Sequence, residues 1–92
     1  MSSGPRSVRL EIITPREMFY EGQVEMLSVP VVSGQEGFMA GHIWCVKLLA
    51  EKGNVKIREA GSNQLKTLAI RGGYVDIKDD FVVYTDGAEW KD

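Results

Sequence analysis

The stretch Tyr74-Val75-Asp76-Ile77-Lys78-Asp79-Asp80-Phe81-Val82-Val83-Tyr84 contains two short apolar runs separated by three polar residues. Valine, isoleucine and aromatic residues favour a pleated strand, and aspartate helps the backbone to bend. The runs at 74–77 and 81–84 are therefore predicted to pair as an antiparallel hairpin across a turn at 78–80. We interpret Asp79 and Asp80 as solvated turn residues rather than as a pair for acid–base catalysis, which would need carboxylates that converge in a cleft.

The same pattern recurs outward along the chain. Residues 55–58 and 65–70 are predicted to form a second hairpin across a turn at 61–63. Residues 8–12 alternate apolar and charged side chains, and Thr14-Pro15 ends that strand because proline cannot donate to a sheet ladder. Short strands at a spacing of roughly ten residues predict an all-β fold, an antiparallel sandwich or a barrel.

The segment between residues 18 and 31 changes its apolar phase. Residues 18–20 are predicted as a short strand closed by Glu21-Gly22, and a second strand is expected over 23–31. The apolar residues of this second strand fall on two faces: Val24 and Met26 on one, and Leu27, Val29 and Val31 on the other. A β-bulge would produce such a slip and could turn both sets into the core. Alternatively, the second set and Ile13 form an exposed apolar patch for docking.

Two segments do not follow the period of two. Residues 33–41 contain Gly34, Gly37 and Gly41, which predicts a loop. This loop lacks the Gly-Lys-Ser/Thr ending of a phosphate-binding loop. Residues 44–52 have the composition of a two-turn helix with Gly53 at its C-cap, although a strand is an equal alternative at this point.

The composition limits the class of protein. A length of 92 residues fits one domain, and a net charge of −2 argues against nucleic acid or an anionic bilayer as the main partner. The single cysteine, Cys45, precludes an internal disulfide and indicates a reducing compartment. The longest apolar runs are about five residues, whereas a membrane-spanning helix needs roughly 20. We therefore expect a soluble intracellular protein.

A catalytic or metal centre is not expected. His42 is the only histidine and Cys45 the only cysteine, whereas a zinc site needs about four ligands, or three and a water. If residues 43–46 are extended, side chains three positions apart point to opposite faces, which disfavours a Cys–His nucleophile pair. A turn-capping or interface role fits His42 better.

The order of these features resembles the N-terminal domain of the ATP synthase epsilon subunit, which is called delta in mitochondria. The matching segments are Thr14-Pro15, Met18-Phe19-Tyr20-Glu21-Gly22 with Val24, Ser28-Val29-Pro30, Gly34-Gln35-Glu36-Gly37-Phe38-Met39-Ala40-Gly41-His42, Gly72-Gly73-Tyr74-Val75-Asp76-Ile77 and Phe81-Val82-Val83-Tyr84-Thr85-Asp86. Together they cover about residues 8–89. The family usually follows Gly-His with a small residue, proline and leucine, whereas this chain has Ile43, Trp44 and Cys45.

The resemblance implies a definite fold. We expect an antiparallel β-sandwich of about ten short strands in two five-stranded sheets, in which residues 46–50 form a strand against their local propensity. The sandwich domain is expected over residues 8–89, with a flexible N-terminal tail over 1–7 and a C-terminal tail over 90–92. The family usually continues beyond this point into a helical hairpin that is associated with inhibition of ATP hydrolysis and, in some bacteria, with ATP binding. We therefore expect no self-inhibition, no nucleotide site and no cofactor.

The resemblance also implies partners and a role. The domain is expected to be a non-catalytic part of the central stalk, docking the gamma subunit to the ring of c subunits so that ion-driven rotation is coupled to ATP synthesis. Carried over by position, Gln35 and Glu36 would face the polar loops of the c ring, and Thr14, His42 and Lys47 would face gamma. The complex is expected at the cytoplasmic side of an energy-transducing membrane, with this subunit peripheral to the bilayer.

Two other classes of function are weighed against this hypothesis. A free-standing β-sandwich module that binds an unrelated protein or ligand would be a stable monomer indifferent to gamma. A small enzyme would need a cleft with perturbed titrating groups, which are hard to build from one histidine and one cysteine.

Overall fold

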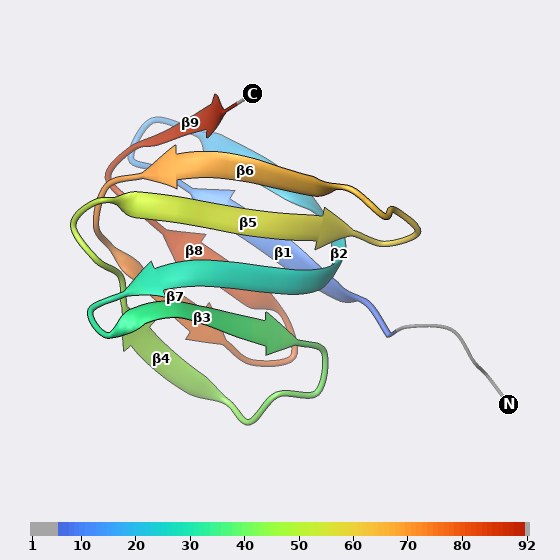
Figure 1. Cartoon of the computed structure of the whole chain (residues 1–92). Coiled ribbons are helices and arrows are strands. Elements are labelled where there is room, and N and C mark those ends of the chain that lie inside the picture. The colour runs from blue at the N-terminus through green and yellow to red at the C-terminus, as the bar shows by residue number, and fades with distance from the viewer. Residues whose placement is uncertain (1–5, 92) are drawn as a thin grey trace, which may run out of the picture.

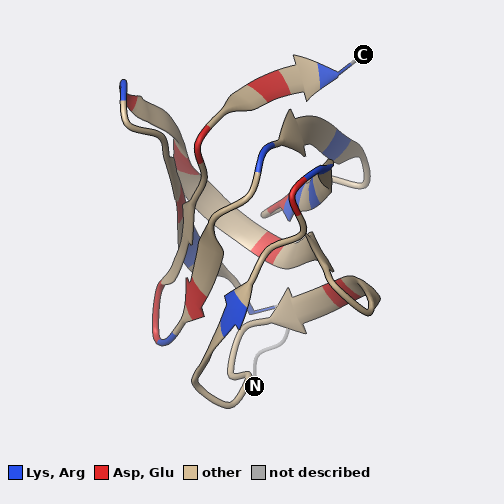
Figure 2. Cartoon of the chain, turned by 90° about the vertical axis from the view of Figure 1, so that its left-hand side faces the viewer, with Lys and Arg blue, Asp and Glu red and all other residues tan. Residues whose placement is uncertain are grey.

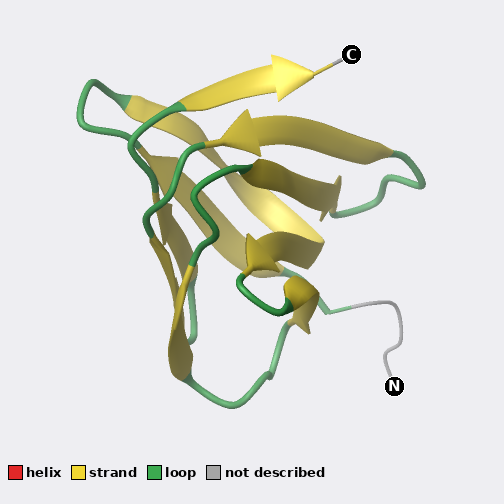
Figure 3. Cartoon of the chain, turned by 60° about the vertical axis from the view of Figure 1, so that its left-hand side comes forward, coloured by secondary structure: helices red, strands yellow, loops and turns green. Residues whose placement is uncertain are grey.

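The computed structural model describes residues 6–91, and these form an all-β domain (Figures 1 and 3). The nine strands are β1 (Val8–Ile13), β2 (Met18–Val31), β3 (Gly34–Met39), β4 (Cys45–Leu48), β5 (Gly53–Glu59), β6 (Leu65–Ile70), β7 (Tyr74–Ile77), β8 (Phe81–Tyr84) and β9 (Ala88–Lys91). Both predicted hairpins are confirmed, β5 with β6 and β7 with β8. Among the described residues, no helix is long and apolar enough to span a membrane.

Strand β2 is longer than predicted and organises the fold. The expected break at Glu21-Gly22 is wrong, because both residues pair in register with β1, Glu21 opposite Glu11 and Gly22 opposite Leu10. The predicted phase slip is confirmed by a register shift between Val24 and Met26 in the ladder with β5. As a result Val24 and Leu27 are both fully buried, although their positions differ in parity. The bulge therefore turns these side chains into the core.

The ladders account for the expected number of strands. The sheet order is β4-β7-β8-β1-β2-β5-β6-β9, with β3 also paired to β2. If the two halves of β2 are counted separately, five strand segments precede the bulge (β4, β7, β8, β1, β2) and five follow it (β3, β2, β5, β6, β9). Nine strands are found instead of ten because β2 serves both groups. The ladder between β1 and β8 is parallel, which corrects the expectation of a wholly antiparallel fold.

The two groups of strands face each other across one apolar core. Phe38 of β3 and Phe81 of β8 are both fully buried, and their ring centroids lie 6.4 Å apart in an edge-on arrangement. No ladder joins β3 to β8 within residues 6–91, so this contact is made between layers. Figure 1 shows β9, β6, β5 and β3 in the layer nearer the viewer, with β8 and β1 behind it. Close packing of such side chains is the main source of stability in a small domain.

The residues from 33 to 52 differ most from local propensity. The glycine-rich segment is not a loop, because residues 34–39 form β3 and pair in register with β2. Residues 45–48 form strand β4 rather than a helix, because β7 supplies a complete antiparallel ladder. Leu49 continues this strand with a bridge to Val31, and the Ala50 N–H donates to the Pro30 carbonyl (2.9 Å). Tertiary pairing thus overrides helix propensity, as the family resemblance implies.

The expected domain boundaries fall partly outside the described residues. Residues 1–5 and 92 lie outside them, and Arg6 and Ser7 precede β1 without joining a strand. The predicted tail over 90–92 cuts through β9, which pairs with β6 as far as Lys91. Trp90 fixes this strand, because its ring lies 5.3 Å from that of Phe19. The folded unit therefore reaches at least Lys91.

Candidate partner interfaces

One outward face of the sheet carries an apolar row at matched positions of four strands. Leu48 lies opposite Tyr74, Tyr74 opposite Tyr84, and Tyr84 opposite Ile13. Their neighbours Val75, Ile77 and Val83 are fully buried, so the alternation of a strand turns these four side chains outward. Leu48 is 73% exposed and Tyr74 is 42% exposed, and the two tyrosine rings are stacked at 4.8 Å. A contiguous exposed apolar surface of this kind usually marks a docking site.

A pocket of about 430 Å³ lies at the Ile13 end of the apolar row. Its lining residues are Ile13, Thr14, Pro15, Gly73, Tyr74, Tyr84, Thr85 and Asp86. We call this the tyrosine pocket. The lining is mainly apolar, and Asp86 supplies its one carboxylate.

The far edge of the tyrosine pocket is fixed by Thr85. The Thr85 side chain is buried, and its hydroxyl accepts a hydrogen bond from the Arg71 N–H (3.2 Å) and donates to the Arg71 carbonyl oxygen (3.0 Å). The Asp86 N–H donates to the same carbonyl (3.1 Å), and the Arg71 N–H also donates to the Gly87 carbonyl (3.1 Å). The backbone that carries Asp86 is therefore held in place before any partner binds.

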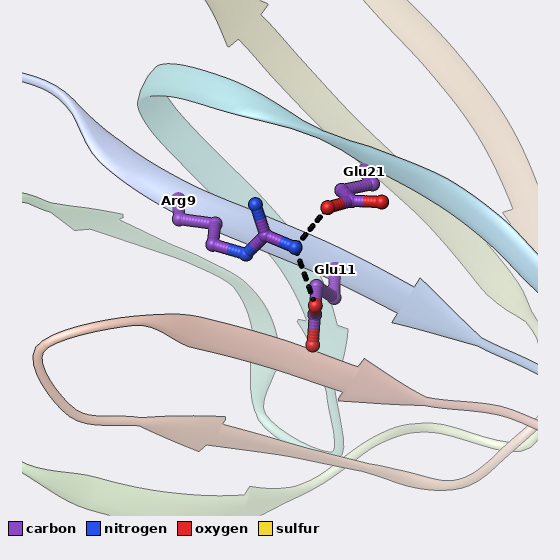
Figure 4. Close-up of polar contacts among 3 residues, drawn as sticks. All are labelled: Arg9, Glu11 and Glu21. Atoms are coloured by element: carbon purple, nitrogen blue, oxygen red, sulfur yellow. Dashed lines mark hydrogen bonds and ion pairs between the residues drawn. The ribbon is translucent and has the colours of Figure 1, made fainter.

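The opposite end of the same face is charged (Figure 4). Glu11 and Glu21 lie directly opposite each other on β1 and β2, where two like charges would repel. The Arg9 guanidinium donates to both carboxylates, to Glu11 at 2.9 Å and to Glu21. The hydrogen bonds from Arg9 to Glu11 and Glu21 raise the pKa of Arg9 above its ordinary value. The face thus runs from an apolar end to a charged end, which is the usual composition of a docking surface and its rim.

Over the rest of the described residues, charges of both signs are interspersed (Figure 2). Basic and acidic residues both occur along the strands and turns in this view, and neither sign forms one large block. Phosphate-backbone binding depends on a concentrated basic surface. This distribution accords with a protein partner more than with a nucleic acid.

The structure places two predicted site residues together. Lys47 of β4 and Glu36 of β3 form an ion pair, with 3.6 Å between Nζ and Oε2. Both side chains are about one-third exposed or more, so the pair contributes only about 0.2–1 kcal/mol. These residues were expected to face different partners, Lys47 toward gamma and Glu36 toward the c ring. The ion pair makes the two residues neighbours, and the partner that each one faces stays a prediction.

The other three predicted site residues lie apart from one another. Thr14 lines the tyrosine pocket, whereas His42 lines a polar pocket at the other end of β1, beside Val8. Six residues of strand separate these ends by about 17 Å, at roughly 3.3 Å per residue. Gln35 lies on β3, where its side-chain N–H donates to the Asn54 carbonyl (2.8 Å). The gamma-facing set therefore does not gather at one point.

The only histidine, His42, packs against the end of the core, and Cys45 lies on β4. The His42 ring lies edge-on to Phe38 at 4.8 Å, and its Nδ1 is 2.8 Å from the Ile43 carbonyl oxygen. Within residues 6–91, no group of three or more His, Cys, Asp or Glu side chains could hold a metal ion. His42 is thus placed to cover the end of the core beside Phe38.

The clearest pKa shifts belong to a polar network that joins the first half of β2 to β5 and β6. The Tyr20 hydroxyl donates to Glu59 (2.6 Å), and Lys66 lies 3.1 Å from the same carboxylate. Burial, together with the hydrogen bond to Glu59, raises the pKa of Tyr20. The hydrogen bonds from Tyr20 and Lys66 lower the pKa of Glu59. These groups join β2, β5 and β6, and none of them lines the tyrosine pocket.

Sequence reasoning did not identify Leu48, Tyr74 or Tyr84 as interface residues. Tyr74 and Tyr84 occupy the positions that alternate with the buried residues of their strands. This alternation in the sequence was enough to predict that both side chains face outward. Leu48 was hidden by the helical interpretation of its segment. The register that aligns the three residues with Ile13 comes from pairing between distant segments, which the sequence does not reveal.

Comparison with known proteins agrees with this architecture. Residues 7–91 match the family described as "ATP synthase, Delta/Epsilon chain, beta-sandwich domain". The ATP synthase epsilon chain of Caldanaerobacter subterraneus is 35% identical over 86 residues, which cover 92% of this chain and 61% of the relative. That of Alkaliphilus metalliredigens is 39% identical over 83 residues, which cover 89% and 60%. The chain thus spans about three-fifths of the length of these curated relatives.

Solved structures share the fold at lower sequence identity. A chain of the Euglena gracilis mitochondrial ATP synthase, from an OSCP/F1/c-ring structure, superposes with a TM-score of 0.84 at 22% identity, covering 97% of this chain and 56% of that one. A chain from a central stalk and c-ring structure of the Tetrahymena thermophila enzyme gives a TM-score of 0.74 at 14% identity, covering 95% and 69%. With the family match over nearly all of its length, this chain belongs to the ATP synthase delta/epsilon β-sandwich family.

Proposed function

We propose that this chain is a non-catalytic central-stalk subunit of an F-type ATP synthase, and that it holds the gamma subunit to the ring of c subunits as the rotor turns. The assignment to this complex is supported by its relatives, which are named as ATP synthase epsilon chains. The exposed apolar row supports the proposal that the chain acts by docking to a neighbouring subunit. A part that transmits torque needs contacts that persist under load, and buried apolar area provides most of the energy of such contacts. The subunit is expected to be peripheral, on the cytoplasmic side of the membrane.

The apolar row is the best candidate for the gamma-facing surface. Leu48 projects from an edge strand with 73% of its side chain exposed, beside the stacked tyrosines. Thr14, expected to face gamma, lines the pocket at the end of this row. Lys47 neighbours Leu48 but points to the other side of β4, so it would contact gamma only at the edge of the interface.

Strand β3 is the best candidate for the surface that faces the c ring. Gln35 is exposed, and its hydrogen bond to the Asn54 carbonyl uses an N–H, so its side-chain oxygen is available as an acceptor. Glu36 is the next residue along the strand and forms an ion pair with Lys47. Polar groups of this kind suit polar loops, and they give orientation more than affinity.

Binding of gamma tests the proposal. We expect the wild-type chain to bind purified gamma from the same organism in isothermal titration calorimetry, and Leu48→Asp to weaken binding at least tenfold, which is about 1.4 kcal/mol. Leu65→Asp is the matched control, because Leu65 is 52% exposed but lies on β6, outside the apolar row. Absence of binding by the wild-type chain would refute the proposal and favour a free-standing binding module. Equal loss in both variants would refute the assignment of the row.

A further inference from the structure

We propose that the tyrosine pocket receives a cationic side chain, arginine or lysine, from the partner subunit that docks on the apolar row. This inference rests on the proposed function, since it names the chemistry by which that partner is recognised. The pocket lies at the end of the row and shares Ile13, Tyr74 and Tyr84 with it. A side chain inserted there would anchor the partner at one fixed position along the face.

The walls of the tyrosine pocket suit a long side chain with an apolar stem. Ile13 and Pro15 offer aliphatic surface, and the stacked rings of Tyr74 and Tyr84 offer aromatic surface. Lysine and arginine bury their methylene stems along such surfaces while their charged ends reach a polar group. Their cations are also attracted to aromatic faces. A volume of about 430 Å³ is within the range of ligand-binding pockets and leaves room for one such side chain.

The single carboxylate of the tyrosine pocket, that of Asp86, indicates that its occupant is positively charged. Among residues 6–91, the Asp86 side chain takes part in no ion pair and no side-chain hydrogen bond. Two basic residues, Arg16 and Arg71, line a neighbouring pocket together with Asp86. Neither is paired with it in the described structure. Asp86 therefore presents a negative charge at the edge of an apolar pocket.

This arrangement selects against other occupants. An apolar side chain that fills the pocket would remove water from Asp86 without replacing its hydrogen bonds, which is costly. An acidic side chain would be repelled. A cation satisfies the carboxylate and the aromatic walls together, and the rigid backbone around Thr85 and Arg71 means that little ordering is needed on binding.

Charge removal at Asp86 tests the inference. In calorimetry with gamma at about 50 mM salt, we expect Asp86→Asn to bind at least tenfold more weakly than wild type, with a smaller dependence on salt. Asp80→Asn is the control, because Asp80 is an exposed carboxylate in the β7–β8 turn, at the other end of these strands. It should bind as wild type does. Both variants keep the shape of the side chain, and their thermal unfolding should match that of wild type.

A second variant tests the aromatic wall. Tyr74→Leu keeps an apolar side chain in the row but removes one ring of the stacked pair, so we expect a roughly threefold to thirtyfold loss of affinity. The outcomes separate the two proposals. If wild type binds gamma and Asp86→Asn binds equally well, the pocket assignment is overturned while the proposed function stands. If wild type does not bind gamma, both are overturned.

Discussion

Gly73 offers the sharpest test of how the strands are packed next to the tyrosine pocket. It precedes β7 with φ at +106°, a conformation that side chains other than glycine adopt only under strain. A Cβ at this position would overlap the Tyr84 carbonyl oxygen and stand 2.8 Å from both the Tyr84 carbonyl carbon and the Thr85 Cα. These are backbone atoms, so the clash cannot be relieved by rotating a side chain. Gly73→Ala must therefore displace β7 from β8 or distort both.

The magnitude follows from two contributions. The positive φ costs about 1–2 kcal/mol for alanine, and forcing extra volume into a packed backbone costs about 1–3 kcal/mol. Reduced entropy of the unfolded chain returns about 0.4–1 kcal/mol. The expected net loss is about 1–5 kcal/mol, with a central value of about 3 kcal/mol. Since a domain of this size has only a few kcal/mol of stability in total, Gly73→Ala should be largely unfolded at 37 °C.

Two matched glycines separate these contributions in urea unfolding followed by circular dichroism. Gly61 also has a positive φ, +80°, but nothing lies within 4 Å of the position that an alanine methyl group would occupy, so Gly61→Ala should show the backbone strain alone, about 1 kcal/mol. Gly37 has an ordinary φ and its nearest atom would be 3.9 Å away, so Gly37→Ala should be close to neutral. If Gly73→Ala and Gly61→Ala lose the same free energy of unfolding within about 0.5 kcal/mol, the described packing of Gly73 against Tyr84 is wrong.

Three further predictions concern the core and the pH dependence of stability. Phe38→Ala should lose about 3–5 kcal/mol in the same urea assay, because it empties the contact with Phe81; a loss below about 1 kcal/mol would contradict the two-layer core. Tyr20 has a raised pKa, so folding favours its protonated form, and wild-type stability should fall as the pH rises above about 10. Urea midpoints between pH 9 and 11 should decline less for Tyr20→Phe, and parallel curves would count against the Tyr20–Glu59 contact. Glu59 has a lowered pKa, so its contribution is present above about pH 4.3 and is lost as the pH falls through the folded-state pKa; Glu59→Gln should flatten the midpoints between pH 3 and 6, and an unchanged slope would refute this.

Local patterns were sufficient for the hairpins but not for the long strand. The turns at 61–63 and 78–80 carry their own signals in glycine, serine, asparagine and aspartate, so both hairpins could be predicted. Gly22 resembles the same signal but lies inside β2, because its backbone pairs with Leu10 and its missing side chain leaves room for the Tyr20 ring. A glycine in a strand and a glycine in a turn look alike until the partner strand is known.

The segments that were misjudged depend on pairing between distant residues. β3 is rich in glycine and β4 has helix-forming residues, yet each is held by a ladder with β2 or β7. The parallel contact between β1 and β8 joins residues about 70 positions apart. Parallel strands are not connected by a short turn, so no local sequence signal predicts this pairing. The apolar row depends on the same pairings, which explains why its members were missed while Thr14, a turn residue of the family pattern, was found beside it.

The most direct test of the proposed role is photo-crosslinking within an assembled ATP synthase that contains this chain. A benzophenone amino acid would replace Leu48 on the apolar row, Gln35 on β3 or, as the control, Leu65 on β6. We predict that position 48 crosslinks to gamma, that position 35 crosslinks to a c subunit, and that position 65 crosslinks to neither. Crosslinking of positions 48 and 35 to the same subunit, or to no subunit of the complex, would contradict a domain that bridges the two.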